Sequence, residues 1–104
     1  MQSEHDIQNS IRLELSNRGY CVFRINVGKV KMADGRWFDT GLPCGFSDLL
    51  AVRDGKAFFI EVKNKTGRVR KDQINFLSKM REIYGCRAGI ARSVDDALRL
   101  VGEE

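Results

Sequence analysis

The chain has 104 residues, 42% hydrophobic and 31% charged, which suits one domain, residues 1–104, built around a single core. No apolar run approaches the ~20 residues of a membrane span, and three scattered cysteines with one histidine argue against a disulfide framework or a zinc site. The net charge of +4 is compatible with a nucleic-acid partner. Because residues 1–6 are polar and unlike a signal peptide, we expect a cytoplasmic protein without a membrane partner.

The first predicted element is a helix. Ser3 is a suitable N-cap, and Ile7, Ile11 and Leu15 recur at the spacing of one helical face. β-Branched and aromatic residues from 20 to 28 then predict a strand. Strand alternation places Tyr20 and Val22 on one face with Arg24 and Asn26, and it places on the other face Cys21, Phe23, Ile25 and Val27.

Two hairpins are predicted next. Asp34-Gly35 is a turn signal inside residues 29–44, where we expect a basic two-stranded flap or an irregular loop. Further along, the strand-like runs 47–53 and 56–63 are separated only by Asp54-Gly55. Two residues of this type between strands strongly indicate a tight hairpin.

The last third of the chain predicts helix, strand, helix. A helix is expected over 71–84, a strand over 86–92, and a final short helix capped by Ser93. Because the middle strands are apolar on both sides, we expect an α/β fold with helices on both faces of a central sheet. The buried stripe of the middle helix is predicted to contain Phe76, Leu77, Met80 and Tyr84.

Three charged side chains meet on one face of the second hairpin. If Asp54-Gly55 forms the turn, Asp48 lies directly opposite Glu61, and strand alternation puts Lys63 on the same face. Opposed side chains have Cβ atoms about 4.5–5.5 Å apart, so the two carboxylates repel unless a cation lies between them. Hard oxygen ligands suit Mg²⁺ or Mn²⁺. The alternatives are an exposed Glu61–Lys63 pair, or a longer loop that shifts the register.

Basic residues gather in two segments, 63–71 and 29–37, and suggest contact with a polyanion, although a solvated loop would explain either segment alone. Trp37 is a candidate for stacking on a base, for core packing or for a subunit contact. The candidate DNA-binding residues are Lys65, Arg68, Arg70, Lys71, Arg24, Asn26, Lys31 and Arg36.

The joint pattern resembles a known family. The motif S-D-(x12)-E-V-K, together with Glu4 in the first helix and Gln73 opening the second, resembles the PD-(D/E)XK nuclease superfamily. "GFSDLLAV", "FFIEVK" and "KDQINFL" are similar to its virus-type replication-repair branch, the VRR-NUC domains. This resemblance implies a restriction-endonuclease-like core, a central mixed sheet flanked by helices. Ser47 departs from the family, which often has proline there to shape the backbone.

The resemblance also implies roles. Lys63 corresponds to the catalytic lysine, Gln73 to a supporting glutamine, and the metal ligands correspond to Asp48, Glu61, the Val62 carbonyl and Glu4, the last directly or through water. The implied activity is Mg²⁺- or Mn²⁺-dependent cleavage of branched DNA by a homodimeric four-way (Holliday) junction resolvase, in a bacterium or a phage-infected cell. The alternatives are a nuclease for flaps, nicks or duplex DNA, and a nucleic-acid-binding module without catalysis.

Overall fold

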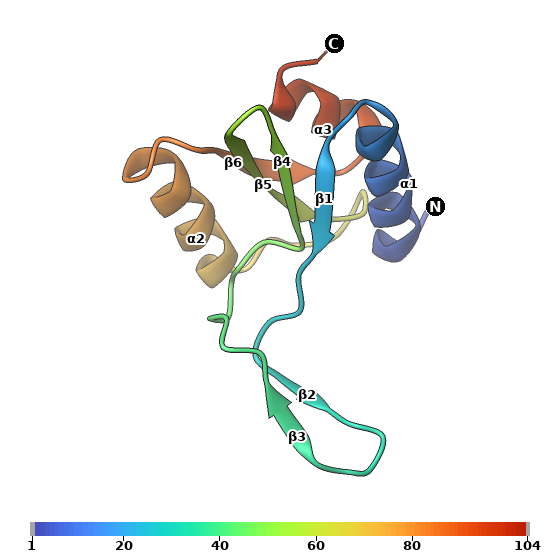
Figure 1. Ribbon diagram of the computed structural model, residues 1–104, viewed down its shortest axis with the longest axis vertical. Coiled ribbons are helices and arrows are strands. Elements are labelled where there is room, and N and C mark those ends of the chain that lie inside the picture. Colours follow the sequence, from blue (N-terminus) through green and yellow to red (C-terminus); the bar gives the residue numbers. More distant parts are fainter. Residues whose placement is uncertain (1, 104) are drawn as a thin grey trace.

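The computed structural model describes residues 2–103 and has an α/β fold, as expected. Its central sheet has the strand order β1-β4-β5-β6, and strands β2 and β3 form a separate hairpin (Figure 1). In the described residues, no helix is long and apolar enough to cross a membrane. The helices are α1 (Glu4–Asn17), α2 (Lys71–Glu82) and α3 (Val94–Val101), and the strands are β1 (Cys21–Arg24), β2 (Lys29–Lys31), β3 (Trp37–Asp39), β4 (Leu49–Arg53), β5 (Lys56–Val62) and β6 (Arg87–Ala91).

The β4–β5 hairpin has the predicted register. Arg53 pairs with Lys56, and the antiparallel ladder runs to Leu49 opposite Ile60. Asp54 and Gly55 have φ values of 52° and 76°, the left-handed conformation at both central positions that a two-residue hairpin turn requires. The β1–β4 pair is antiparallel and the β5–β6 pair is parallel, so the sheet is mixed, as the family resemblance implied.

Helices α1 and α3 cover one face of the sheet. Ser3 caps α1 by accepting a hydrogen bond from the Asp6 backbone N–H. The helical stripe that includes Ile11 and Leu15 is buried in one cluster with Phe58 and Ile60 of β5. Ser93 caps α3 in the same way, through the backbone N–H of Asp96, so both predicted caps are confirmed.

Helix α2 covers only part of the opposite face. Phe46 and Phe59 meet Phe76 of α2 in a cluster of aromatic rings with centroids 4.5–5.9 Å apart. The helix ends at Glu82, so Tyr84, predicted to lie in its buried stripe, is 61% exposed. That prediction was wrong because the helical spacing was extended past the last helical turn.

The predicted strand over 20–28 is shorter than expected. β1 spans Cys21–Arg24 at the edge of the sheet, and just beyond it the Ile25 N–H donates to the carbonyl of Asp48, the residue before β4. An edge strand has one pairing partner, so its ladder ends where that partner turns away.

Residues 29–39 form the predicted basic flap, called the arm below. Val30 pairs with Phe38 and Lys31 with Trp37, and the chain reverses through Ala33-Asp34-Gly35, where Gly35 has φ 90°. Figure 1 shows the arm projecting well away from the sheet and helices, at the end of two connecting segments.

Candidate active site

Asp48 and Glu61 lie where β4 begins and β5 ends. The observed register, continued by one position, places them opposite each other, as the hairpin predicted. Asp48 Oδ2 accepts a hydrogen bond from the Val62 backbone N–H at 2.9 Å, which ties the start of one strand to the end of the other. Just before it, the buried Ser47 donates from Oγ to the Leu49 carbonyl at 3.1 Å and shapes this backbone without proline.

Glu61 is a buried carboxyl group with one oxygen left unpartnered. Its side chain is 2% exposed, and Oε2 accepts a hydrogen bond from Gln73 Nε2 at 2.8 Å and lies 3.7 Å from Lys63 Nζ. No donor reaches Oε1 among the described residues. Burial, and then the negative charge of Asp48, raise the pKa of Glu61 to about 8, against the opposing effect of Lys63. Two neighbouring acids, one of them buried, are stabilised when a proton or a cation binds to them.

Helix α2 supplies the neutral hydrogen-bond partner of Glu61. Gln73 lies in the first turn and is 5% exposed, and its Oε1 accepts from the Arg70 backbone N–H at 2.9 Å while its Nε2 binds Glu61. Gly45 lets the chain approach this helix end closely: a Cβ there would lie 2.5 Å from the Asp72 carbonyl oxygen, and its φ is 93°. The N-terminus of α2 is therefore held against the two acids.

The loop after β5 is fixed by an arginine that the sequence analysis missed. Arg92 Nη1 donates to the carbonyl oxygens of Asn64 and Gly67, at 2.6 and 2.9 Å. The Lys63 backbone N–H donates to the Ala91 carbonyl at 3.1 Å, so the start of this loop is also attached to the end of β6. Parallel strands end at the same edge of a sheet, and predicting that β6 pairs with β5 would have brought Arg92 to this loop.

Glu4 lies beside Lys63 and outside the acidic pair. A Cβ on Gly67 would lie 3.2 Å from Glu4 Oε2 and 3.4 Å from Lys63 Cδ, so both side chains border the loop. Within residues 2–103, no three His, Cys, Asp or Glu side chains come close enough to hold a metal ion. The structure thus joins Asp48 to Glu61 but does not bring Glu4 into a group with them.

The buried Glu61 and the half-buried Asp48 still suit a hard divalent cation. The two acids offer carboxylate oxygens, and Glu61 Oε1 is buried and unpartnered. Oxygen donors of this kind match Mg²⁺ and Mn²⁺, with water completing the coordination. The donor atoms of these residues therefore fit such an ion. Val62, the last residue of β5, lies beside both acids.

The candidate DNA-binding residues are all exposed, but two of them already pair with acids. Arg70 Nε lies 3.3 Å from Asp72 and Arg36 Nε lies 2.7 Å from Asp34. In the described part of the chain, no ion pair engages the others. The unpaired members follow β5 and open α2, extend the arm or end β1, and they are Lys65, Arg68, Lys71, Lys31 and Arg24, with the neutral Asn26 beside the last.

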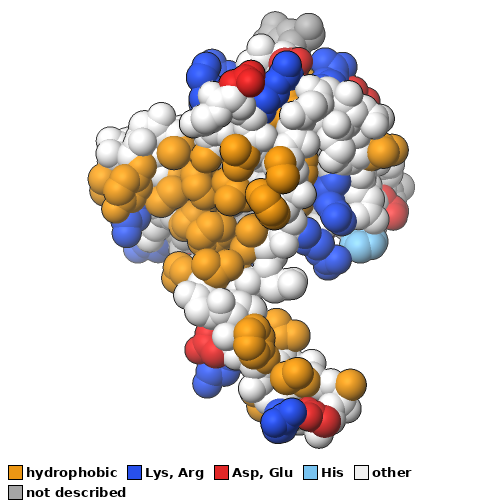
Figure 2. Space-filling view, in the orientation of Figure 1, with side chains coloured by type: hydrophobic (Ala, Val, Ile, Leu, Met, Phe, Trp, Pro, Cys, Tyr) orange, Lys and Arg blue, Asp and Glu red, His pale blue; other side chains and the backbone are white. Residues whose placement is uncertain are grey.

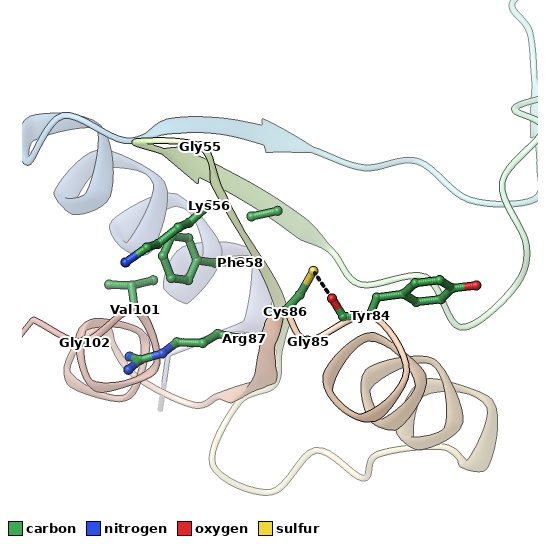
Figure 3. A pocket seen from close by; sticks show the side chains of 10 residues that line it. Gly55, Lys56, Phe58, Tyr84, Gly85, Cys86, Arg87, Val101 and Gly102 are labelled. Carbon is green, nitrogen blue, oxygen red and sulfur yellow. Dashed lines mark hydrogen bonds between the residues drawn. The ribbon is translucent and has the colours of Figure 1, made fainter.

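A hollow of about 600 Å³ lies at the other end of β5. Figure 3 shows it between the starts of β5 and β6 and the end of α3, with Lys56 and Arg87 beside it. None of the predicted site residues lines this hollow. Because the acids and Lys63 belong to the opposite strand ends, the hollow does not belong to the candidate active site.

Comparisons with known proteins agree with this geometry. The model of the VRR-NUC domain family matches residues 2–95. No curated protein matches significantly. A solved structure described as "VRR_NUC domain" superimposes with a TM-score of 0.68 at 19% identity, covering 97% of this chain and 96% of the other, a likeness that concerns the fold. With a family match across most of its length, the chain belongs to the VRR-NUC domain family, which implies a DNA-acting nuclease of the PD-(D/E)XK type.

Proposed function

We propose that the protein is a Mg²⁺- or Mn²⁺-dependent endonuclease that hydrolyses phosphodiester bonds in branched DNA. The observation that supports this most is the buried Glu61 carboxyl group, opposite Asp48, with one oxygen unpartnered and a pKa raised to about 8. A strand that served structure alone would gain stability from an apolar residue at this position.

Asp48, Glu61 and the carbonyl of Val62 are the residues that would hold the ion. When bound, Mg²⁺ or Mn²⁺ would supply a Lewis acid for the scissile phosphate and a field that favours deprotonation of water. Gln73 holds the Glu61 carboxyl group in one orientation through its 2.8 Å hydrogen bond. Glu4 borders the loop beside Lys63, where a water-mediated role fits its exposed carboxylate better than direct binding.

Lys63 is the proposed catalytic cation. The residue is 7% exposed, with Nζ 3.7 Å from Glu61 Oε2, so a preorganised positive charge stands next to the acids. There it would orient the attacking water or stabilise the negative charge that develops on the phosphate. Arg92 keeps the loop that follows Lys63 in place and acts as a positioning residue.

The proposed substrate is a four-way junction cut by a homodimer, as the family resemblance implied. The unpaired Lys65, Arg68 and Lys71 next to the site are suited to the phosphate backbone, which attracts protein cations regardless of sequence. A two-fold pair of sites is suited to paired cuts in a symmetric junction.

Cleavage of matched labelled DNAs tests the proposal. Four-way junction, flap, nicked and linear duplex DNA would each be incubated with Mg²⁺, Mn²⁺, Ca²⁺ or EDTA. We expect cleavage of the junction in Mg²⁺ and Mn²⁺, and binding without turnover in Ca²⁺, which takes more ligands at longer distances. Preferential cutting of flaps or duplex DNA would mean that this DNA, and not the four-way junction, is the substrate. Binding without cleavage in every metal would indicate a non-catalytic module.

A further inference from the structure

Trp37, the single tryptophan of the chain, lies exposed on the arm. The residue belongs to β3 and is 63% exposed. Among residues 2–103, no aromatic ring or cation stacks on its indole. Burial of an aromatic side chain removes about 150–250 Å² from water, so an indole left in solvent is a strong indication of a partner. The exposure also excludes a role for Trp37 in core packing.

Two lysines accompany Trp37 on one side of the arm. The hairpin pairs Lys31 with Trp37 and Lys29 with Asp39, and strand alternation puts both pairs on the same side. Both lysines are exposed, and in the described part of the chain neither forms an ion pair. The carboxylate of Asp39 instead accepts a hydrogen bond from the Gly41 N–H at 2.8 Å. The side formed by Lys29, Lys31 and Trp37, called the indole side below, therefore combines an open ring with free cations.

The arm starts from the strand ends that hold the candidate active site. The Ile25 N–H donates to the Asp48 carbonyl at 2.8 Å just before the chain enters the arm, and the segment that leaves the arm leads back to Asp48. Figure 1 shows the arm leaving the sheet where β1 ends and β4 begins. Lys31 is six residues beyond Ile25, a span of at most about 20–22 Å, which is less than one ~34 Å turn of duplex DNA. DNA held at the acids is therefore within reach of the indole side.

Hydrogen bonds at the base of the arm fix its connections. The Gly28 carbonyl accepts from the backbone N–H of Thr40 at 2.9 Å and from its hydroxyl at 3.0 Å, and the Gly28 N–H donates to the Leu42 carbonyl at 3.3 Å. Figure 2 shows the arm standing clear of the rest of the molecule, with hydrophobic and basic side chains on its surface. Because its base is already ordered, the arm loses little conformational freedom when it presents Trp37 to a partner.

We propose that the indole side of the arm binds the branch point of the DNA substrate, with Trp37 stacked on a base that has lost its neighbour there and with Lys29 and Lys31 on the adjoining phosphates. Inside a linear duplex the next base pairs cover both faces of every base, so an indole can stack only by unstacking a step, at a cost in free energy. A branch point or a single-stranded end already exposes a base face. Trp37 is therefore a residue that distinguishes branched DNA from linear DNA.

The charge of the indole side favours DNA over a protein as its partner. Lys29 and Lys31 are complementary to phosphates, and base faces stack on aromatic side chains regardless of sequence. The apolar pair Val30 and Phe38 lies on the opposite side of the arm and takes no part in this contact. The inference rests on the DNA substrate in the proposed function and identifies the feature of that DNA which the protein recognises.

Fluorescence of the single tryptophan tests the contact without reference to cleavage. The protein would be titrated in Ca²⁺, in which we expect binding without turnover, with a four-way junction, a flap and a linear duplex of equal phosphate number. The junction and the flap should quench the emission, because an indole stacked on a base loses fluorescence, and the linear duplex should leave it unchanged. The control is a double variant, Trp37→Phe with Leu13→Trp. Position 13 lies on α1 and is 65% exposed in the unaltered chain, so no DNA should quench this variant.

Binding affinity measures the size of the contact. By anisotropy of labelled DNA, Trp37→Ala should weaken binding to the junction by about 5–150-fold, the range that corresponds to one base–aromatic stack, and leave binding to the linear duplex unchanged. Trp37→Phe keeps an aromatic face and should retain most of the affinity. Trp37→Leu keeps apolar bulk in the hairpin without a ring, and it should behave like Trp37→Ala.

Tyr84→Ala is the matched control for loss of an exposed aromatic ring. Tyr84 is 61% exposed, follows α2 and borders the hollow at the other end of β5, so this variant should bind every DNA normally. Thermal unfolding of each variant checks that the fold is intact. Unaltered affinity of Trp37→Ala for the junction would overturn the inference, as would an equal loss for the junction and the linear duplex.

The failures of the two proposals are distinguishable. Quenching by the junction and not by the duplex, without cleavage in any metal, would retain the contact and overturn the nuclease activity. Cleavage of the junction without any change in Trp37 emission on binding would overturn the contact and leave the metal-dependent nuclease. Equal quenching by all three DNAs would overturn the recognition of the branch point.

Discussion

The end of β5 and the arm use charge in opposite ways. Glu61 and Lys63 are 2% and 7% exposed; Gln73 of α2 donates to the Glu61 carboxylate, and Ala91 of β6 accepts from the Lys63 backbone N–H. In the arm, Lys31 and Arg36 are exposed, and the Arg36 side chain pairs with Asp34, two residues away. Buried charges depend on distant parts of the fold, whereas exposed ones need only their neighbours.

Buried charges and exposed charges are therefore suited to different steps, the buried ones to cleavage and the exposed ones to DNA binding. A charge held rigidly in a dry site can act on a developing transition state, and an exposed charge mainly attracts a polyanion from solution. Substitutions at the end of β5 should therefore change the rate of cutting, and substitutions on exposed segments should change affinity and its dependence on salt.

The largest effect is expected from the acids. Asp48→Asn and Glu61→Gln should each lower single-turnover cleavage by at least about 1,000-fold, because the metal they hold contributes several kcal/mol of charge stabilisation. DNA binding should change little. Asp39→Asn in the arm, a matched carboxylate whose Oδ1 accepts from the Gly41 N–H, should cut normally. Near-normal cutting by either site variant in Mg²⁺ would remove these acids from the mechanism.

Lys63→Ala is expected to slow the chemical step by about 10²–10³, the cost of losing one preorganised electrostatic donor. Calorimetric titration with Mn²⁺ should find metal affinity unchanged or slightly tighter, since a nearby positive charge is gone. Lys65→Ala, two residues on and exposed, is the control and should retain the single-turnover rate. If Lys63→Ala lost metal affinity as severely as Glu61→Ala, Lys63 would be structural.

Arg92→Ala should lower kcat by about 10–100-fold, the range seen when an outer support of a site is removed. KM and the salt dependence of binding should stay nearly constant, because Arg92 bonds to loop carbonyls. Arg87→Ala removes a similar bond, from Arg87 Nη1 to the Leu100 carbonyl at the other end of β6, and should leave kcat unaltered. Equal losses in both variants would mean that Arg92 contributes only to stability.

A triple replacement of Lys65, Arg68 and Lys71 by alanine should weaken binding to every DNA structure. The slope of log K against log salt should decrease by about 2.7, since each lost phosphate contact removes roughly 0.9. Arg70→Ala should change the slope less, because Asp72 already pairs with Arg70. Fluorescence anisotropy across a salt series measures both, and an unchanged slope in the triple variant would place these residues away from DNA.

The smallest expected effect concerns stability and pH. The pKa of Glu61 is raised from 4.5 to about 8, so its contribution to stability is complete below pH 4.5 and is lost as pH rises towards 8. In EDTA, Glu61→Gln should therefore raise Tm by about 5–10 °C at pH 8.5, the shift that roughly 1–2 kcal/mol produces in a domain of this size. At pH 4.5 the difference should vanish. Glu82→Gln, at an exposed position, is the control. A gain in Tm for Glu61→Gln that does not depend on pH would contradict the raised pKa of Glu61.

Local turn chemistry made part of the site predictable. Asp54-Gly55 accepts left-handed dihedrals at both positions, and that choice alone sets which residues face each other along β4 and β5. The opposition of Asp48 and Glu61 follows from counting back from the turn. The caps Ser3 and Ser93 were equally predictable, because each satisfies a backbone N–H within three residues.

The remaining features depend on contacts between distant segments. Arg92 reaches the loop after β5 only because β6 docks parallel to β5, and nothing near Arg92 in the sequence indicates that pairing. The position of Glu4 beside Lys63 depends on how α1 docks against the sheet. The length of α2, and hence the exposure of Tyr84, is decided where the chain leaves the helix for β6.

The parallel pairing of β5 with β6 also orders the assembly of the site in time. The β4–β5 hairpin joins through two residues and can close as soon as it is synthesised, so Asp48 and Glu61 meet early. The loop that follows Lys63 has no anchor until a crossover through α2 delivers Ala91 and Arg92 to its side. A growing polypeptide therefore acquires its acids before the support for its lysine, and we expect a chain that ends before β6 to lack the proposed activity.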